Sequence, residues 1–269
     1  MKQDHPLVVG LVGIAGSGKT STANAIAPTA KIEHSPKGDS SIIWDHLYFA
    51  LPLYRMANAK QQISGPKAED RIAYEIHATL VDAFGSNPLF GAPSYDQLVH
   101  MVNEIKAIPT PETGKPRHFL QYVGTDICRA YDPDVWVKWV ERTIRSRYLE
   151  HLRDFSDEDK LDQQIPHCGI IVSDCRFRNE VDMITSQPNG VLIKLNISAG
   201  RAIERQIRRD GGISISDEQS LHASEQDIQM VPEEAYDAII DVDYLDFKSQ
   251  VEAVKEAINT KIGASLEYA

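Results

Sequence analysis

The sequence has neither a long hydrophobic run nor a surplus of positive charge. No apolar run in its 269 residues approaches the length of a membrane span, and the N-terminal MKQDHPLVVG lacks the apolar segment and cleavage site of a signal peptide. The formal net charge of −11 argues against a general nucleic-acid binder, although a few arginines can still form a site for a small anion. We therefore expect a soluble cytoplasmic protein that binds neither membranes nor nucleic acid.

Cysteine is also scarce. The chain has three cysteines, Cys128, Cys168 and Cys175, and no CxxC spacing. An odd number without such spacing indicates neither a disulfide framework nor a zinc site. We expect reduced thiols in or near the core, which suits the cytoplasm.

Apolar runs of strand length alternate with longer segments of helical period, which is the pattern of a parallel α/β sheet. The expected strands are 7–13, 168–174, 190–197 and 237–242. The expected helices are 19–27, 117–130, 134–152, 177–185, 200–209 and 247–262. Most residues of each strand are apolar, as in strands that helices cover on both faces. The predicted fold class is therefore α/β.

One segment departs from this alternation. Between residues 57 and 116, helical pieces are separated by SGP, GSNPLFGAP and PTPETGKP. This pattern indicates an insertion in a single domain whose core comprises about 1–56 and 117–262. The polar, glycine-bearing stretch DGGISISDEQSLHASEQD after the helix at 200–209 indicates a loop, and a lid over about 201–226 is one interpretation of this region.

The stretch GLVGIAGSGKTS at residues 10–21 satisfies the phosphate-loop pattern G-x-x-x-x-G-K-[ST] between a strand and a helix. Small residues let successive N–H groups of such a loop point at an anion near a helix N-terminus. Lys19 would contact the β and γ phosphates of ATP, and the hydroxyl of Thr20 or Ser21 would bind Mg²⁺. The residues expected around the ATP phosphates are Gly13, Ala15, Gly16, Ser17, Gly18, Lys19, Thr20 and Ser21.

Charged residues follow the strand GIIVSD. Asp174 could hold the metal through water, or could simply cap the next helix. Arg176, Arg178 and Glu180 come next, at the edge where open α/β folds place ligands. Arg176 could clamp a second phosphate, because a guanidinium makes two parallel hydrogen bonds.

Two further segments carry candidate residues. In LQYVGTDICRAYDPDVW, Arg129 and Asp132 could bind a monophosphate and a base edge, whereas the tryptophans that follow are more typical of a core. In GRAIERQIRRDGG, Arg201, Arg205 and Arg208 share one helix face. That face could be merely solvated, or it could close over phosphates as part of a lid.

Four segments, GIAGSGKTS, LQYVGTDICR…DVW, VSDCRFRNEV and HASEQDI, together resemble the deoxynucleoside monophosphate kinases of bacteriophages. DHLYFALPLYRMA also resembles the start of that family's acceptor-binding region. The resemblance implies a P-loop NTPase fold, three-layer αβα with a parallel sheet, in which the insertion at about 57–116 binds the nucleoside monophosphate and a lid covers it. In this chain Thr20 stands where some relatives have Asp, and Arg178 where relatives often have Pro.

The implied activity is transfer of the γ-phosphoryl group of ATP to a deoxynucleoside 5′-monophosphate with Mg²⁺, giving dNDP and ADP for DNA synthesis. Lys19, Arg176, Arg205 and Arg208 would act on the transferring phosphate. Arg129, Asp132, Arg176 and Glu180 would bind the acceptor, and Thr20 and Asp174 the metal. The role of His222, Ser224 and Glu225 in HASE stays open, with Ser224 as a helix cap one possibility.

Other functions remain open on the sequence alone. The same loop serves other small-molecule kinases, such as those acting on dephospho-coenzyme A or shikimate. An ATPase module of a replication or packaging assembly would need no acceptor, and a nucleotide-binding scaffold would have no turnover. The accepted base, the choice between ribose and deoxyribose, and the oligomeric state, a homodimer included, do not follow from these residues.

Overall fold

The computed structural model describes residues 5–27, 42–87, 91–110, 116–154, 167–209, 227–228 and 230–267. Within these ranges the chain forms two compact units, one of residues 1–48 and 144–269 and the other of residues 49–143. None of the described helices is both long and apolar enough to cross a membrane. All three cysteines are buried and free of disulfides, as the sequence predicts.

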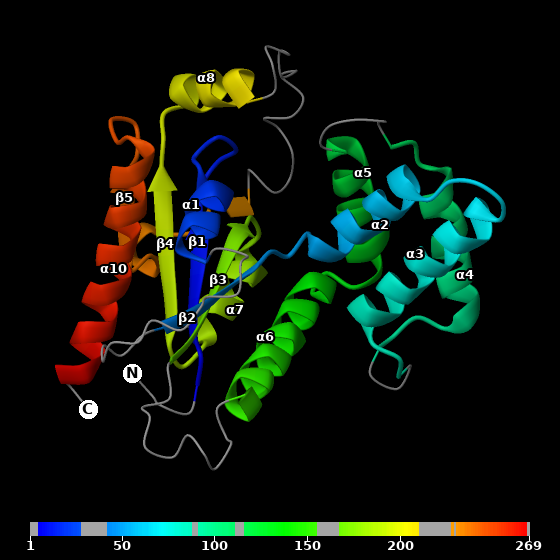
Figure 1. Ribbon diagram of the computed structural model, residues 1–269, viewed down its shortest axis with the longest axis horizontal. Coiled ribbons are helices and arrows are strands. Elements are labelled where there is room, and N and C mark those ends of the chain that lie inside the picture. The colour runs from blue at the N-terminus through cyan, green and yellow to red at the C-terminus, as the bar shows by residue number, and fades with distance from the viewer. Residues whose placement is uncertain are drawn as a thin grey trace. The chain divides into compact units, whose positions relative to one another are not determined.

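The first unit is built on a five-stranded parallel sheet in the order β2-β3-β1-β4-β5 (Figure 1). The strands are β1 (Leu7–Val12), β2 (Ile42–Leu47), β3 (His167–Cys175), β4 (Gly190–Asn196) and β5 (Ala238–Asp241). The central strand β1 is buried at all six positions. The α/β class is therefore confirmed, and this sheet is consistent with a P-loop NTPase.

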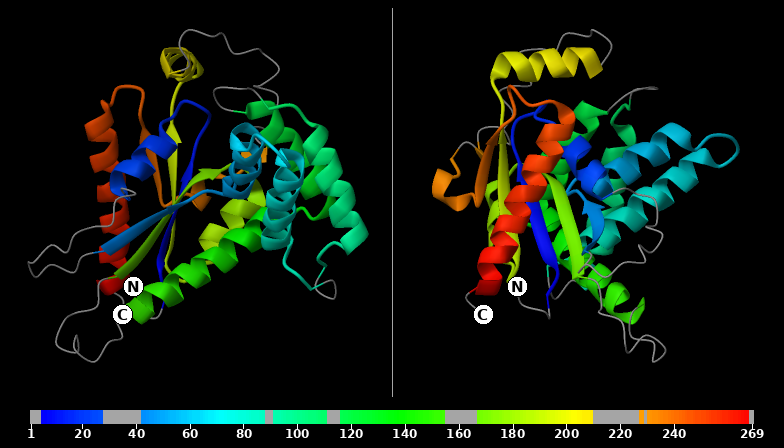
Figure 2. Two further views of the ribbon diagram at one scale, coloured as in Figure 1. Left: turned by 45° about the vertical axis from the view of Figure 1, so that its right-hand side comes forward. Right: turned by 60° about the vertical axis from the view of Figure 1, so that its left-hand side comes forward.

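Helices cover both faces of this sheet. The helices α1 (Lys19–Ile26) and α10 (Phe247–Glu267) pack on one face, and α10 runs along the strands (Figure 2). The helix α7 (Arg178–Ser186) packs on the other face, where Ile184 lies against Gly10 of β1. The helix α8 (Ala199–Arg209) follows β4 directly. This three-layer arrangement places the ends of β1, β3 and β4 together at one edge.

The second unit is helical. Its helices are α2 (Leu51–Gln62), α3 (Ala68–Phe84), α4 (Tyr95–Ala107), α5 (Arg117–Gln121), the π-helix η2 (Tyr122–Arg129) and the first half of α6 (Val135–Asp154). Ser94 and Gln97 form a capping box at the start of α4. Among the side chains of its core, Met56, Ile76, Leu80, Ile105 and Phe119 are each at most 2% exposed. A core of its own explains why this unit is compact.

The second unit extends beyond both ends of the predicted insertion. Residues 49–56 and 117–143 belong to it as well. Leu53 of α2 lies against Gly124 of η2, and the indole of Trp136 donates a hydrogen bond to the Gly124 carbonyl at 3.1 Å. These contacts tie the segment LQYVGTDICR…DVW to α2, so the candidates Arg129 and Asp132 belong to the helical unit.

The helical stretch predicted over 117–130 is confirmed, but only its first turn is α-helical, because residues 122–129 form a π-helix. The wider turn of a π-helix shifts side chains relative to the α-helical spacing on which sequence patterns rely. Pi-helical turns are rare and are found frequently at functional sites.

Candidate functional site: a phosphate loop at the end of the central strand

The loop between β1 and α1 has the backbone that the glycines predict. Gly13, Gly16 and Gly18 have φ angles of 149°, 94° and 90°, a region that favours residues without a Cβ atom. The hydroxyl-bearing side chains of Thr20 and Ser21 are exposed in the first turn of α1. The first N–H groups of any α-helix have no acceptor within the helix, so this turn offers free donors to an anion.

Lys19 lies over this loop. It is 7% exposed, and its ammonium group donates hydrogen bonds to the carbonyls of Gly13 and Ile14, the latter at 3.0 Å, and to the Ser17 hydroxyl at 3.4 Å. These three partners are neutral oxygens. A phosphate, with a full negative charge, would be a stronger partner for the ammonium than they are.

The end of β3 lies beside the loop, since Cys175 is paired with Val12. Asp174 is partly buried there. Ser173, which is 1% exposed, has its hydroxyl 2.7 Å from Nε2 of His46 on β2, and Nδ1 of His46 is 2.8 Å from the Asn24 side chain on α1. His46 thus connects β2, β3 and α1 below the loop.

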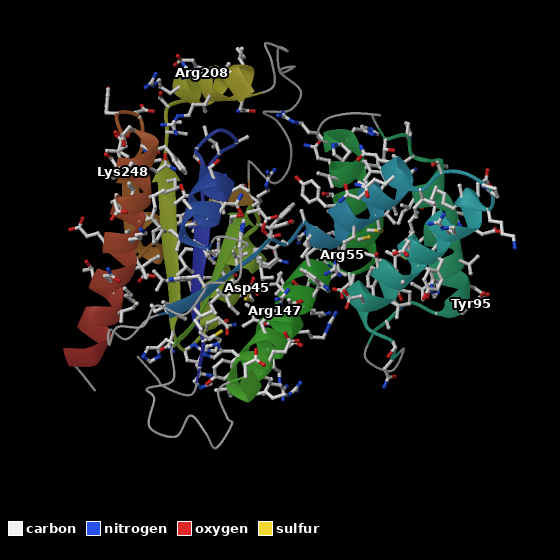
Figure 3. The ribbon with its side chains drawn as sticks, in the orientation of Figure 1. Asp45, Arg55, Tyr95, Arg147, Arg208 and Lys248 are labelled. Atoms are coloured by element: carbon white, nitrogen blue, oxygen red, sulfur yellow. The ribbon has the colours of Figure 1, made fainter. Side chains whose placement is uncertain are left out.

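The strand β2 is held on its other side as well. The guanidinium of Arg147 on α6 forms an ion pair at 3.1 Å with Asp45 (Figure 3). Both side chains are partly exposed, and exposed ion pairs contribute little to stability. The pair therefore matters for the position of β2 more than for the free energy of unfolding.

Burial lowers the pKa of His46 below its usual value near 6.5, and the carboxylates of Asp174 and Asp45 oppose this shift. The unfolded chain thus takes up a proton at a higher pH than the folded protein. We expect the His46 contribution to stability to be complete above pH 6.5 and to fall as the pH drops from 6.5 toward the lowered pKa. The melting temperature of His46→Asn should therefore fall less than that of the wild type when the pH is lowered from 7.5 to 5.5.

Thermal melts at the two pH values measure this difference, with His100→Asn as the control because His100 is exposed on α4. An equal fall in melting temperature for the wild type and His46→Asn would contradict the assignment to His46.

The Glu180 side chain binds backbone N–H groups at the start of α7. This carboxylate is 2% exposed, and one oxygen accepts hydrogen bonds from the N–H groups of Arg176 and Phe177 at 2.7 and 3.1 Å. It therefore orders the turn from β3 into α7. The Arg176 guanidinium forms no hydrogen bond or ion pair within the part of the chain that the structure describes, and Arg176 is partly buried. In contrast, Arg178 is exposed and lies 3.9 Å from Asp182.

The arginines of the basic helix α8 have different partners. Arg208 (Figure 3) is 77% exposed at its side chain and pairs with Glu204. Arg201 pairs with the same glutamate and also donates hydrogen bonds to the Asp243 carbonyl at 3.2 and 3.4 Å. Arg205 instead donates a hydrogen bond to the Val242 carbonyl at 2.8 Å and contacts the Gln250 side chain at 3.4 Å. The predicted lid continues into residues 210–226, which lie outside the described ranges together with His222, Ser224 and Glu225.

In the helical unit, Arg129 donates a hydrogen bond to the Pro133 carbonyl at 2.7 Å. One oxygen of Asp132 accepts from the N–H of Asp134 at 3.0 Å, and the other pairs with Lys138 at 2.8 Å. Asp132 thus stabilises the start of α6. Arg129 is partly buried and its guanidinium is held by the Pro133 carbonyl.

Three groups around the loop were missed by sequence reasoning: His46, Gln206 and Gln250. Gln206 and Gln250 are 7% and 2% exposed, and both donate hydrogen bonds to loop carbonyls. Each comes from a different element far along the chain, and no local pattern marks them. The polar His46 within the apolar run of β2 was the one available signal.

For metal binding, no group of three or more His, Cys, Asp and Glu side chains forms a cage among the described residues. A Mg²⁺ ion that arrives with nucleotide phosphates needs only one or two protein oxygens. The exposed Thr20 hydroxyl and the Asp174 carboxylate fit such a partial set.

No protein-family model matches the chain. An 81-residue stretch, 30% of this chain, is 35% identical to a curated protein of Acanthamoeba polyphaga mimivirus named "Putative deoxynucleotide monophosphate kinase". The chain matches 38% of the length of that relative. The comparison thus finds partial similarity to a viral protein that is named as a nucleotide kinase.

Proposed function

We propose that this protein transfers the γ-phosphoryl group of ATP to a deoxynucleoside 5′-monophosphate, giving ADP and a deoxynucleoside diphosphate. The observation that carries the proposal is the loop of Gly13 to Thr20 at the end of β1, with Lys19 buried at the loop. Arg176 follows Cys175 of β3, which is paired with Val12 at the start of the loop. The partial similarity to the mimivirus protein supports a kinase over a hydrolase.

Each residue has a proposed task. Lys19 exchanges its carbonyl partners for the β and γ phosphates, while the loop N–H groups and the α1 N-terminus hold them. Arg176 neutralises the charge of the phosphoryl group as it moves, since its guanidinium is uncommitted within the described residues. Thr20 and Asp174 would hold Mg²⁺, which supplies further positive charge to the phosphates.

Arg129 of the helical unit is the proposed contact to the acceptor phosphate, which would replace the Pro133 carbonyl as its partner, and Arg208 is the proposed lid contact. Arg205 and Glu180 are left out of these sets, because their side chains hold Val242 and the start of α7, respectively. Asp132 is left out for the same reason. The acceptor phosphate is already an anion at neutral pH, so the reaction needs no general base.

The test is an ADP-release assay with Mg·ATP against each deoxynucleoside and ribonucleoside monophosphate. We expect ADP with a deoxynucleoside monophosphate, and about 100-fold lower kcat/KM for Arg176→Ala. Arg178→Ala, two residues along, is the matched control and should retain activity because Arg178 is exposed and pairs with Asp182 at the surface.

Two other results of this assay would contradict the proposed activity. ADP release at the same rate without an acceptor would indicate an ATPase. ADP release only with dephospho-coenzyme A or shikimate would indicate another small-molecule kinase.

A further inference from the structure

Two glutamine side chains from different helices hold the phosphate loop from outside. Nε2 of Gln206 on α8 donates a hydrogen bond to the Ala15 carbonyl at 2.9 Å. Nε2 of Gln250 on α10 donates to the Ser17 carbonyl at 3.0 Å and to the Thr22 hydroxyl at 2.9 Å. A carbonyl oxygen can only accept, so the amide nitrogen must face the loop in both cases.

These contacts fix the direction of two N–H groups in the loop. The described peptide bonds are trans, and in a trans peptide the carbonyl and the following N–H point to opposite sides. A hydrogen bond that holds the Ala15 carbonyl toward α8 therefore turns the Gly16 N–H away from α8. By the same geometry, the Gln250 contact to the Ser17 carbonyl turns the Gly18 N–H away from α10.

The phosphate loop lies close to both α8 and α10. A Cβ atom added at Gly16 would lie 2.5 Å from the Ala202 carbonyl of α8, and one at Gly18 would lie 2.6 Å from the Gln250 amide. The glycines thus allow the approach that brings both amides within hydrogen-bonding distance.

The Gln250 amide is in turn held in place. Its two N–H groups bind Ser17 and Thr22, and its oxygen lies 3.4 Å from the Arg205 guanidinium. Arg205 also binds the carbonyl of Val242, the residue that follows β5. Arg205 and Gln206 are neighbours on α8, so this one helix turn reaches the loop directly through Gln206 and indirectly through Gln250.

We propose that Gln206 and Gln250 are positioning residues that keep the N–H groups of Gly16 and Gly18 directed at a bound polyphosphate, with Arg205 aligning Gln250. The inference deepens the proposed function and rests on phosphate binding at this loop. A leucine at either position has nearly the same volume, but it donates no hydrogen bond, so the carbonyl would be free to rotate.

The first measurement needs no ligand. The amides of Ser17 and Thr22 bond the carbonyls of Ile14 and Gly18. Their hydrogen exchange should be about tenfold faster in Gln206→Leu and Gln250→Leu than in the wild type, because loosening the loop by about 1.4 kcal/mol corresponds to a factor of ten. Exchange in β3 should stay unchanged. The matched controls are Ile207→Leu on α8 and Glu252→Gln on α10, both at exposed positions.

The second measurement is calorimetric binding of tripolyphosphate and ADP. We expect at least about tenfold weaker binding of both in the two glutamine variants, and wild-type affinity in the controls. If Gln250→Leu does not fold, Gln250→Met, which is also uncharged and donates no hydrogen bond, is used instead.

Wild-type exchange in the loop and wild-type affinity in folded variants would overturn the inference. The proposed function fails separately, if the wild-type protein binds neither tripolyphosphate nor ADP. In that case, loop exchange still decides whether the glutamines hold the loop.

Discussion

Lys19→Met is expected to lower phosphoryl transfer by at least about 100-fold, the loss typical of removing one donor that stabilises transition-state charge. The ammonium of Lys19 is 7% exposed and lies within hydrogen-bonding distance of Gly13, Ile14 and Ser17. It is therefore held at the loop before any nucleotide binds. Methionine retains the length of the side chain but supplies no charge to the phosphates. The rate of ADP release under saturating ATP and acceptor measures the effect.

The control for this prediction is Lys255→Met on α10, since Lys255 is exposed and pairs with Glu252 at the surface. Its activity should match the wild type. Lys19→Met leaves loop carbonyls without their donor, so melting temperatures must accompany the rates. Wild-type turnover by a folded Lys19→Met protein would show that this loop takes no part in phosphoryl transfer.

The sheet and the loop could be predicted from the sequence because their signals are local. An apolar strand, a glycine-rich turn and a helix follow one another within residues 7–26, and the structure forms these elements at nearly the expected bounds. The strands β3 and β4 were equally clear, since both are apolar over most of their length. Fold class therefore followed from runs of adjacent residues.

The strand β2 was missed for a physical reason. Its residues IIWDHL include Asp45 and His46, and each is only partly buried because β2 lies at the edge of the sheet. An edge strand keeps polar groups that a central strand excludes. Its place is set by pairing with β3 and by the contacts of Asp45 and His46 with residues far along the chain.

Arginines and carboxylates were the least predictable part of the site. Sequence spacing placed Arg201, Arg205 and Arg208 on one face, but it could not show that Arg205 binds the Val242 carbonyl. Glu180 follows Arg176 by four residues, and only the fold reveals that its carboxylate accepts the Arg176 N–H. Whether a charged side chain serves the backbone or a ligand depends on tertiary contacts that no local pattern contains.

Glu180→Ala is expected to destabilise the protein by about 3 kcal/mol, because two N–H groups at the start of α7 lose the acceptor that one buried carboxylate now provides. Glu180→Gln keeps an acceptor oxygen without the charge, and it should lose less than half as much. Glu252→Ala, an exposed change on α10, should stay within about 0.5 kcal/mol of the wild type. Denaturant unfolding compares the three variants.

The same variants separate stability from catalysis at Arg176. The Glu180 carboxylate fixes the Arg176 backbone, so its loss should also move the guanidinium that we assign to the transferring phosphate. Where Glu180→Ala is fully folded, its kcat should still be about tenfold lower than that of the wild type. A displacement of a reacting or catalytic group by about 1 Å can cost that much or more. Full activity of the folded variant would mean that Arg176 reaches the phosphate without this constraint, or does not act on it at all.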